Sequence, residues 1–137
     1  MKQTVTAMEK ENPIDEARRY VENAKKILKE NGELDTSTNQ YGDRKYVRMA
    51  GNTLWNGMLV LLEAVFKVKA GKTKGRPDII DYRKAIGDRN RKLLDVVNGA
   101  YDTMHLYMGY DGTLSKKVCD GAFEYAALVI GICAKMI

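Results

Sequence analysis

The sequence has few of the residues that build metal sites, disulfide frameworks and disordered segments. It contains one histidine, two cysteines and two prolines in 137 residues. One histidine and two dispersed cysteines do not give the ligand spacing of a metal site, so we expect no metal and no other cofactor. Two prolines and 45% hydrophobic residues argue against a disordered chain.

The two cysteines, Cys119 and Cys133, are expected to remain free thiols. They lie on one predicted helix, where a rise of about 1.5 Å per residue separates them by roughly 21 Å, too far for an intramolecular disulfide. Cys133 also lies in an apolar run, where a reduced thiol behaves as a small hydrophobic side chain.

Long hydrophobic runs are also missing. The most apolar stretch, residues 126–134, is far shorter than the ~20 residues that cross a bilayer. The N-terminal stretch "MKQTVTAMEKEN" is polar and has no hydrophobic region of a secretory signal. These features predict a soluble, cytoplasmic protein with no membrane partner.

The net charge of +5 is unevenly distributed. Residues 67–92 contain ten basic and three acidic residues, which gives this segment a charge of +7. A localised positive field attracts anions such as a nucleic acid or a nucleotide, whereas the alternative is a solvated loop and helix face. The candidate binding residues are Lys72, Lys74, Arg76, Arg83, Arg89 and Arg91.

Five segments have the periodicity of amphipathic helices, and none alternates like a half-buried strand. Asn12 and Pro13 are typical of a helix start, as are Pro77 and Asp78, and Asp88 is a predicted N-cap. Short connections favour antiparallel neighbours, so we predict an all-α, up-and-down bundle of four to five helices. Residues 1–11 are a predicted flexible tail and residues 12–137 one domain. The predicted helices are approximately 12–31, 44–70, 77–86, 88–108 and 114–137.

Glycine occurs inside several predicted helices, where each one lowers stability by roughly 1 kcal/mol relative to alanine. Compensation by close approach of neighbouring helices is the expected reason. The positions are Gly51, Gly57, Gly99, Gly121 and Gly131.

The second predicted helix has two apolar faces. Its predicted core stripe consists of Val47, Ala50, Leu54, Met58, Leu61 and Val65. The opposite face mixes polar and apolar residues, and such a face is covered by another helix, by a second copy of the protein or by a ligand. We predict a homodimer, also because the last helix is apolar. The candidate interface residues are Met49, Asn52, Asn56, Leu59 and Val60.

The fourth predicted helix carries the single histidine, His105, on the shoulder of its apolar stripe. Asn98 lies on the same shoulder, and Asp102 precedes His105 by three residues, so the two can meet on one helix face. A carboxylate beside a histidine orients the ring and favours its charged form, which is typical both of acid–base sites and of structural pairs.

Three segments together resemble the HEPN-like helical domains of bacteria, and most closely an uncharacterised branch of them. They are "IDEARRYVENAKKIL", "KYVRMAGNTLWNGMLVLLEAVF" and "DVVNGAYDTMHLYMGYDG", within residues 12–135. The resemblance implies a bundle of four or five helices, frequent dimerisation and work on or beside RNA. It also implies a protein partner, since some relatives accompany nucleotidyltransferases in toxin–antitoxin pairs.

Catalytic HEPN-like members have an arginine upstream of a histidine on the late helix. If His105 matches that histidine, the arginine would occupy a position at which this sequence has Asn98, Gly99 or Ala100. Ribonuclease chemistry needs a base for the 2′-hydroxyl and charge for the transition state. The sequence therefore favours a non-catalytic interaction or binding module. The alternative is a divergent ribonuclease that uses His105 with Asp102 and Asn98.

Overall fold

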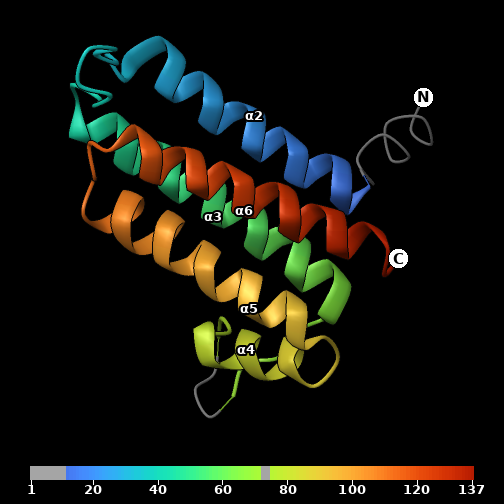
Figure 1. Cartoon of the computed structure of the whole chain (residues 1–137). Coiled ribbons are helices and arrows are strands. Elements are labelled where there is room, and N and C mark those ends of the chain that lie inside the picture. Colours follow the sequence, from blue (N-terminus) through green and yellow to red (C-terminus); the bar gives the residue numbers. More distant parts are fainter. Residues whose placement is uncertain (1–11, 72–74) are drawn as a thin grey trace.

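The fold is a bundle of antiparallel helices, seen in a computed structural model that describes residues 12–71 and 75–137. Four rods run alternately up and down, and the short α4 lies beside α5 (Figure 1). The described residues form no strand, so the predicted all-α up-and-down bundle is confirmed; the predicted tail, residues 1–11, lies outside them. The elements are α2 (Pro13–Asn31), α3 (Arg44–Phe66), α4 (Ile79–Gly87), α5 (Arg91–Ala100), the π-helix η1 (Tyr101–Tyr110) and α6 (Lys116–Ala134).

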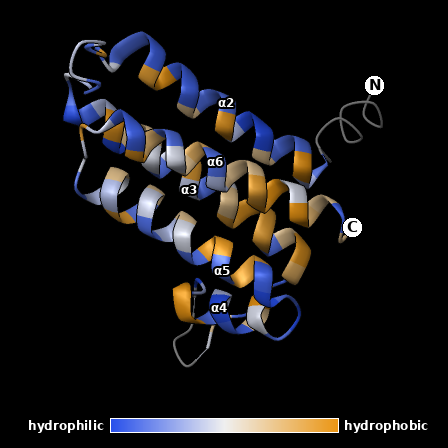
Figure 2. Ribbon diagram, viewed as in Figure 1, coloured by the Kyte–Doolittle hydropathy of each residue, from blue (hydrophilic) through white to orange (hydrophobic). Residues whose placement is uncertain are grey.

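The core lies between the rods and follows the predicted stripes. Hydrophobic residues gather where the helices face each other, and the outer side of α2 is mainly hydrophilic (Figure 2). Each leucine or methionine that becomes fully buried stabilises the fold by roughly 1.5–3 kcal/mol. The predicted α3 stripe is buried apart from Val65, which is partly buried. The fully buried residues of the fourth predicted helix include Leu93, Val97, Met104 and Met108.

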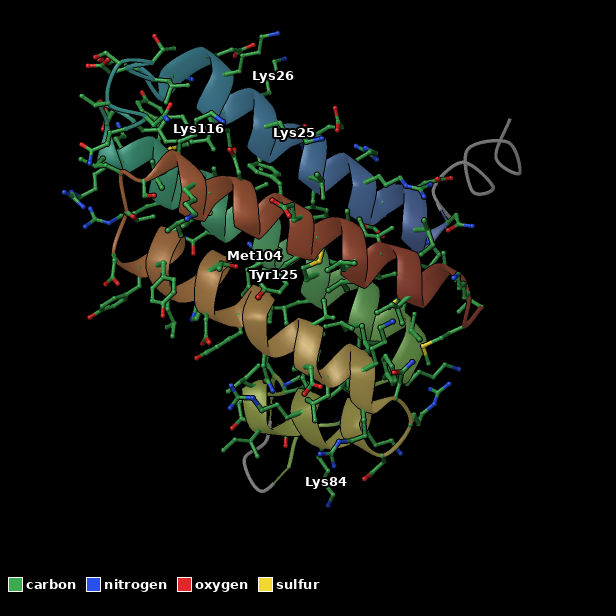
Figure 3. All side chains as sticks on the ribbon, viewed as in Figure 1. Lys25, Lys26, Lys84, Met104, Lys116 and Tyr125 are labelled. Atoms are coloured by element: carbon green, nitrogen blue, oxygen red, sulfur yellow. The ribbon has the colours of Figure 1, made fainter. Side chains whose placement is uncertain are left out.

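Three of the five helical glycines mark places where helices approach closely, as predicted. A Cβ added at Gly51 would lie 2.5 Å from Cβ of Met108, so α3 and η1 could not pack as they do. The corresponding neighbours of Gly57 and Gly99 are Tyr20 and Tyr125. Figure 3 shows Tyr125 between α6 and α5.

The other two glycines, Gly121 and Gly131, do not fit this explanation. Apart from its own helix backbone and chain neighbours, an added Cβ at either position would have no atom of residues 12–71 or 75–137 within 4 Å, so the predicted close approach is wrong there. Both lie on α6, where they leave open space on the helix surface.

Two helix boundaries differ from the predicted ones for local backbone reasons. The helix expected to reach residue 70 ends at Phe66, because Lys67 has a φ of 52° and the left-handed conformation stops the helix. The next long helix is capped by Asn90 and not by Asp88. The Asn90 side chain accepts a hydrogen bond from the Leu93 N–H at 2.9 Å.

The π-helix η1 continues α5 without a break. Its i→i+5 hydrogen bonding is illustrated at its end, where the Asp111 N–H donates to the Leu106 carbonyl at 2.9 Å. This bonding winds more residues into each turn than the roughly 3.6 of an α-helix. Residues spaced by four therefore remain on one face, and Ala100, Met104 and Met108 are all buried.

Candidate functional site

A cleft of about 410 Å³ lies between α3, η1 and the start of α4. The second face of α3 and the histidine of η1, which are far apart in the sequence, both line this cleft. From α3 it is lined by Asn52, Trp55, Asn56 and Leu59, from η1 by Tyr101 and His105, and from the α4 region by Arg76, Pro77, Asp78, Ile79 and Tyr82.

The two asparagines of α3 offer unused amides to this cleft. Asn52 and Asn56 are exposed and lie one helical turn apart, so their side chains share one face. Neither amide forms a hydrogen bond with a residue that the structure describes. Asn52 lies against Gly109 of η1, where any added Cβ would collide with its side chain. Each amide carries both donors and an acceptor for a ligand.

Aromatic rings form another part of the cleft wall. The Tyr101 and His105 ring centres are 5.1 Å apart, and Trp55 meets Tyr101 edge-on at 5.5 Å. Trp55 is only 6% exposed, which fixes this wall against the core. The nitrogens of His105 form no hydrogen bond with any described residue, so both remain available to a ligand.

Tyr82 closes the floor of the cleft. Burial raises the pKa of its hydroxyl above the usual value; the Glu63 carboxylate adds to this effect and Arg76 opposes it. The hydroxyl is therefore protonated at neutral pH and can donate a hydrogen bond.

The other two candidate catalytic residues are not gathered around His105. Asp102 is exposed, and neither a hydrogen bond nor an ion pair joins its carboxylate to His105 among the described side chains. The π-winding explains this, because residues three apart share a face of an α-helix but are turned further apart in η1. Asn98 instead accepts a hydrogen bond from Nε of Arg83 at 2.8 Å.

The predicted basic residues have different roles in the structure. Arg76 is exposed and lines the cleft, and its guanidinium forms no ion pair with a described residue. Arg91 is exposed at the start of α5, away from the cleft lining. Lys72 and Lys74 lie outside the described residues.

Arg83 and Arg89 each contact a residue of a neighbouring helix. The Arg83 guanidinium carbon lies 5.3 Å from the centre of the Tyr101 ring, which holds α4 against η1. Arg89 lies 4.8 Å from the Phe66 ring and donates to the Val65 carbonyl at 3.3 Å, which holds the α4–α5 connection against the end of α3.

Comparison with known proteins places the chain in a family. Residues 12–135 match the domain of unknown function DUF5618. The chain belongs to this family. A protein of unknown function from Dyadobacter fermentans has a similar structure, with 31% sequence identity and a TM-score of 0.79, covering 90% of this chain and 93% of its own. Comparison with curated proteins gives no match. Neither description names an activity for a DUF5618 domain.

Metal binding, membrane spanning and the state of the cysteines were the other expectations for the DUF5618 domain. Over residues 12–71 and 75–137, histidine, cysteine and acidic side chains do not gather in threes or more as a metal site requires. None of the described helices combines the length and apolar character needed to span a bilayer. Both cysteines are free and buried.

The predicted interface residues of α3 are divided between two hollows. Asn52, Asn56 and Leu59 line the cleft, and Val60 lines an adjoining groove of about 350 Å³ together with Asn56 and Leu59. Met49 lies outside both and is 43% exposed. This face of α3 is therefore flanked by α2 and α4 but remains open.

The homodimer remains a prediction, and we expect its contact on the part of the α3 face around Met49, which lies outside the cleft. Met49→Asp should weaken self-association at least tenfold, because a buried charge without a partner is strongly unfavourable. Light scattering across a micromolar concentration series measures the effect. Asn23→Asp, at an exposed polar position of α2, is the control. A wild-type mass of 15.4 kDa at every concentration would rule the dimer out.

Proposed function

We propose that this domain is a non-catalytic binding module whose cleft holds a nucleotide, free or as one unit of single-stranded RNA. The observation that carries the proposal is the meeting of two unpartnered amides, an aromatic wall and an unpaired arginine in one hollow. Bases exposed in single strands are stacked on aromatic side chains and hydrogen-bonded along their edges. Asn52 and Asn56 would bind the base edge, and Arg76 would bind the phosphate.

Size and charge are consistent with such a ligand. A volume of about 410 Å³ falls in the range of small-molecule sites, ~300–1,000 Å³. Asp78 also lines the cleft, but its carboxylate already accepts the Asp81 N–H at 3.1 Å as the N-cap of α4. Arg76 also lines the cleft but caps no helix and forms no ion pair with a described residue, so its guanidinium is available to a phosphate.

The resemblance to HEPN-like domains supports the same proposal, since many of those domains work on or beside RNA. It adds two parts to the proposal. The module acts as a homodimer, and it accompanies a partner protein in a pair of the toxin–antitoxin type. Both parts can fail without affecting nucleotide binding by the cleft.

A divergent ribonuclease is the second candidate, and one observation favours it. Arg83 lies outside the expected sequence spacing, yet it reaches Asn98 and the Tyr101 ring that packs on His105. Against this, His105 has no carboxylate partner among the described residues. Binding therefore explains the cleft better than catalysis.

We expect the cleft amides to account for much of the affinity for a nucleotide. The double variant Asn52→Ala/Asn56→Ala should bind 5′-AMP and a short fluorescent oligoribonucleotide about 10–100-fold more weakly, since two hydrogen bonds contribute about 1–3 kcal/mol. Arg76→Ala should reduce the salt dependence of oligoribonucleotide binding, because one phosphate contact is lost. Titration by fluorescence anisotropy and calorimetry measures both effects.

Asn23→Ala, at an exposed asparagine of α2, is the matched control and should bind like wild type. Equal affinity of wild type and the double variant would remove the cleft from the proposal. The oligoribonucleotide should also be recovered intact. Cleavage by wild type that disappears in His105→Ala, at unchanged melting temperature, would instead establish the ribonuclease.

A further inference from the structure

A second and larger cavity lies between the end of α2, the loop that follows it and the start of α6. Its volume is about 760 Å³, and none of its lining residues belongs to the nucleotide cleft. Lys25 on α2 and Lys116 on α6 are labelled on the two helices that flank it (Figure 3). Its apolar lining is Leu28, Leu34, Tyr41 and Phe123.

Tyr41 occupies the base of this cavity because two local features fix its ring. Gly32 leaves room for it, since an added Cβ there would lie 2.8 Å from Cδ1 of Tyr41. The Tyr41 N–H donates to the Leu114 carbonyl at 2.8 Å, and the Lys116 N–H donates to the Asn39 carbonyl at 3.1 Å. The loop is thus tied to the start of α6, and the cavity wall is held in place.

The Tyr41 hydroxyl points to a ligand. The residue is only 9% exposed, and its hydroxyl forms no hydrogen bond with a described residue. In the described part of the chain, no fully buried side-chain polar atom lacks a partner, so this oxygen is accessible to solvent, and Tyr41 lines the cavity. Burial raises the pKa of Tyr41, with Cys119 and Asp120 adding to it. A largely buried hydroxyl without a protein partner favours a polar ligand group.

Charge around the cavity identifies the sign of that group. Four carboxylates line it against two lysines, and two of the carboxylates are already paired, Glu30 with Lys26 and Asp120 with Lys116. Lys25 is already bound by Glu22, with 3.4 Å between nitrogen and oxygen. Glu33 and Glu124 form no ion pair with a described residue. Among the described lining residues, two unpaired carboxylates then face one unpaired lysine, Lys29, which leaves a surplus of one negative charge that a cation would neutralise.

An aromatic ring adds to the attraction for a cation. The Lys25 ammonium lies 6.0 Å from the centre of the Phe123 ring, within the range of a cation–π interaction. The chain itself thus shows that this ring can accept an alkylammonium. Leu28, on the neighbouring turn of α2, offers apolar surface for the body that carries such a group.

We propose that this cavity binds an organic amine. Its protonated amino group lies between Glu33, Glu124 and the Tyr41 hydroxyl oxygen, which accepts a hydrogen bond from it. Its apolar body packs on Leu28 and Phe123. The volume is in the range of known small-molecule sites, roughly 300–1,000 Å³.

The test uses 2-phenylethylamine as the probe and the full chain labelled with ¹⁵N. Saturable chemical-shift changes are expected in residues 28–41 and 120–124, and not in residues 52–59 of the nucleotide cleft. The uncharged analogue 2-phenylethanol should bind at least tenfold more weakly. N-acetyl-lysine amide distinguishes the source of the amine: tighter binding than the free amine identifies a peptide lysine as the natural group.

Two variants keep the test independent of folding. Glu33→Gln/Glu124→Gln should weaken amine binding at least tenfold, and Tyr41→Phe should weaken it severalfold at unchanged fold, checked by the rest of the spectrum. Asp95→Asn, an exposed carboxylate of α5, is the matched control and should bind like wild type. Absence of saturable shifts at millimolar amine, or equal binding of 2-phenylethanol, overturns the proposal.

Discussion

Gly51→Ala is expected to destabilise the protein by about 3 kcal/mol, although it adds a single methyl group. The new Cβ would lie 2.5 Å from Cβ of Met108 and 2.6 Å from the Met104 carbonyl oxygen. Backbone atoms cannot yield as a flexible side-chain end does, so α3 and η1 must move apart. Thermal unfolding should show a melting temperature lower by on the order of 10 °C.

Gly131→Ala provides the matched control, because it makes the same chemical change in open space. Beyond its own helix backbone and chain neighbours, no atom of the described part of the chain lies within 4 Å of the added Cβ, and the residue is helical and exposed. We expect the free energy of unfolding of this variant to rise by about 0.5–1 kcal/mol, since alanine has a higher helix propensity than glycine. Similar stabilities for the two variants would show that α3 and η1 do not pack this closely.

Both thiols should be strongly protected from alkylation in the native protein. Burial raises the pKa of Cys119 to about 12, with Asp120 adding to it, and raises the pKa of Cys133 to about 11. The thiolate is the reactive form, so at pH 8 alkylation should slow by roughly a thousandfold at Cys119 and a hundredfold at Cys133 relative to a free thiol. Iodoacetamide labelling followed by mass spectrometry measures this.

The same pKa values give a direction for alkaline stability. Below pH 9 both thiols are protonated in the folded and unfolded states, so this contribution is fully present. As pH rises from 9 towards 12, the unfolded chain loses its thiol protons first, and stability is lost. Asn23→Cys, at an exposed position, should label as quickly as a free thiol. Rapid labelling of Cys119 at pH 8 without urea would contradict the burial.

Local sequence signals predicted much of the fold. The errors lie where the backbone conformation of a few residues decides the end or the winding of a helix. The start of α2 follows from Asn12, whose side chain accepts the Ile14 N–H at 2.7 Å, as an N-cap does. The end of α3 was placed about four residues too late, because a lysine in the left-handed conformation has no distinctive sequence signal. The π-winding of η1 was also missed, since its apolar spacing resembles that of an α-helix.

Some residues of the candidate cleft could be predicted singly, whereas its aromatic residues and its assembly could not. The mixed face of α3 and the shoulder position of His105 were both visible in the sequence. The α3 face and His105 line one cleft because α3 and η1 pack against each other. Arg76 lines the same cleft because the segment before α4 also lies there. The second cavity gave no local signal, because Tyr41, Glu33 and Glu124 are brought together by a loop and two helices distant in sequence.

The π-helix has a consequence for how the length of this region can vary. Ten residues of α-helix rise about 15 Å, and the wider winding of η1 covers less distance with the same number of residues. The end of η1 lies against α3. There Arg44 donates a hydrogen bond to the Gly112 carbonyl at 2.9 Å, and Arg48 donates one to the Tyr110 carbonyl at 3.2 Å. Deleting one residue from η1 would turn the following side chains around the helix axis. Either the methionines would leave the core or the histidine would leave the cleft. The packing of η1 against α3 therefore constrains the chain length between residues 101 and 110.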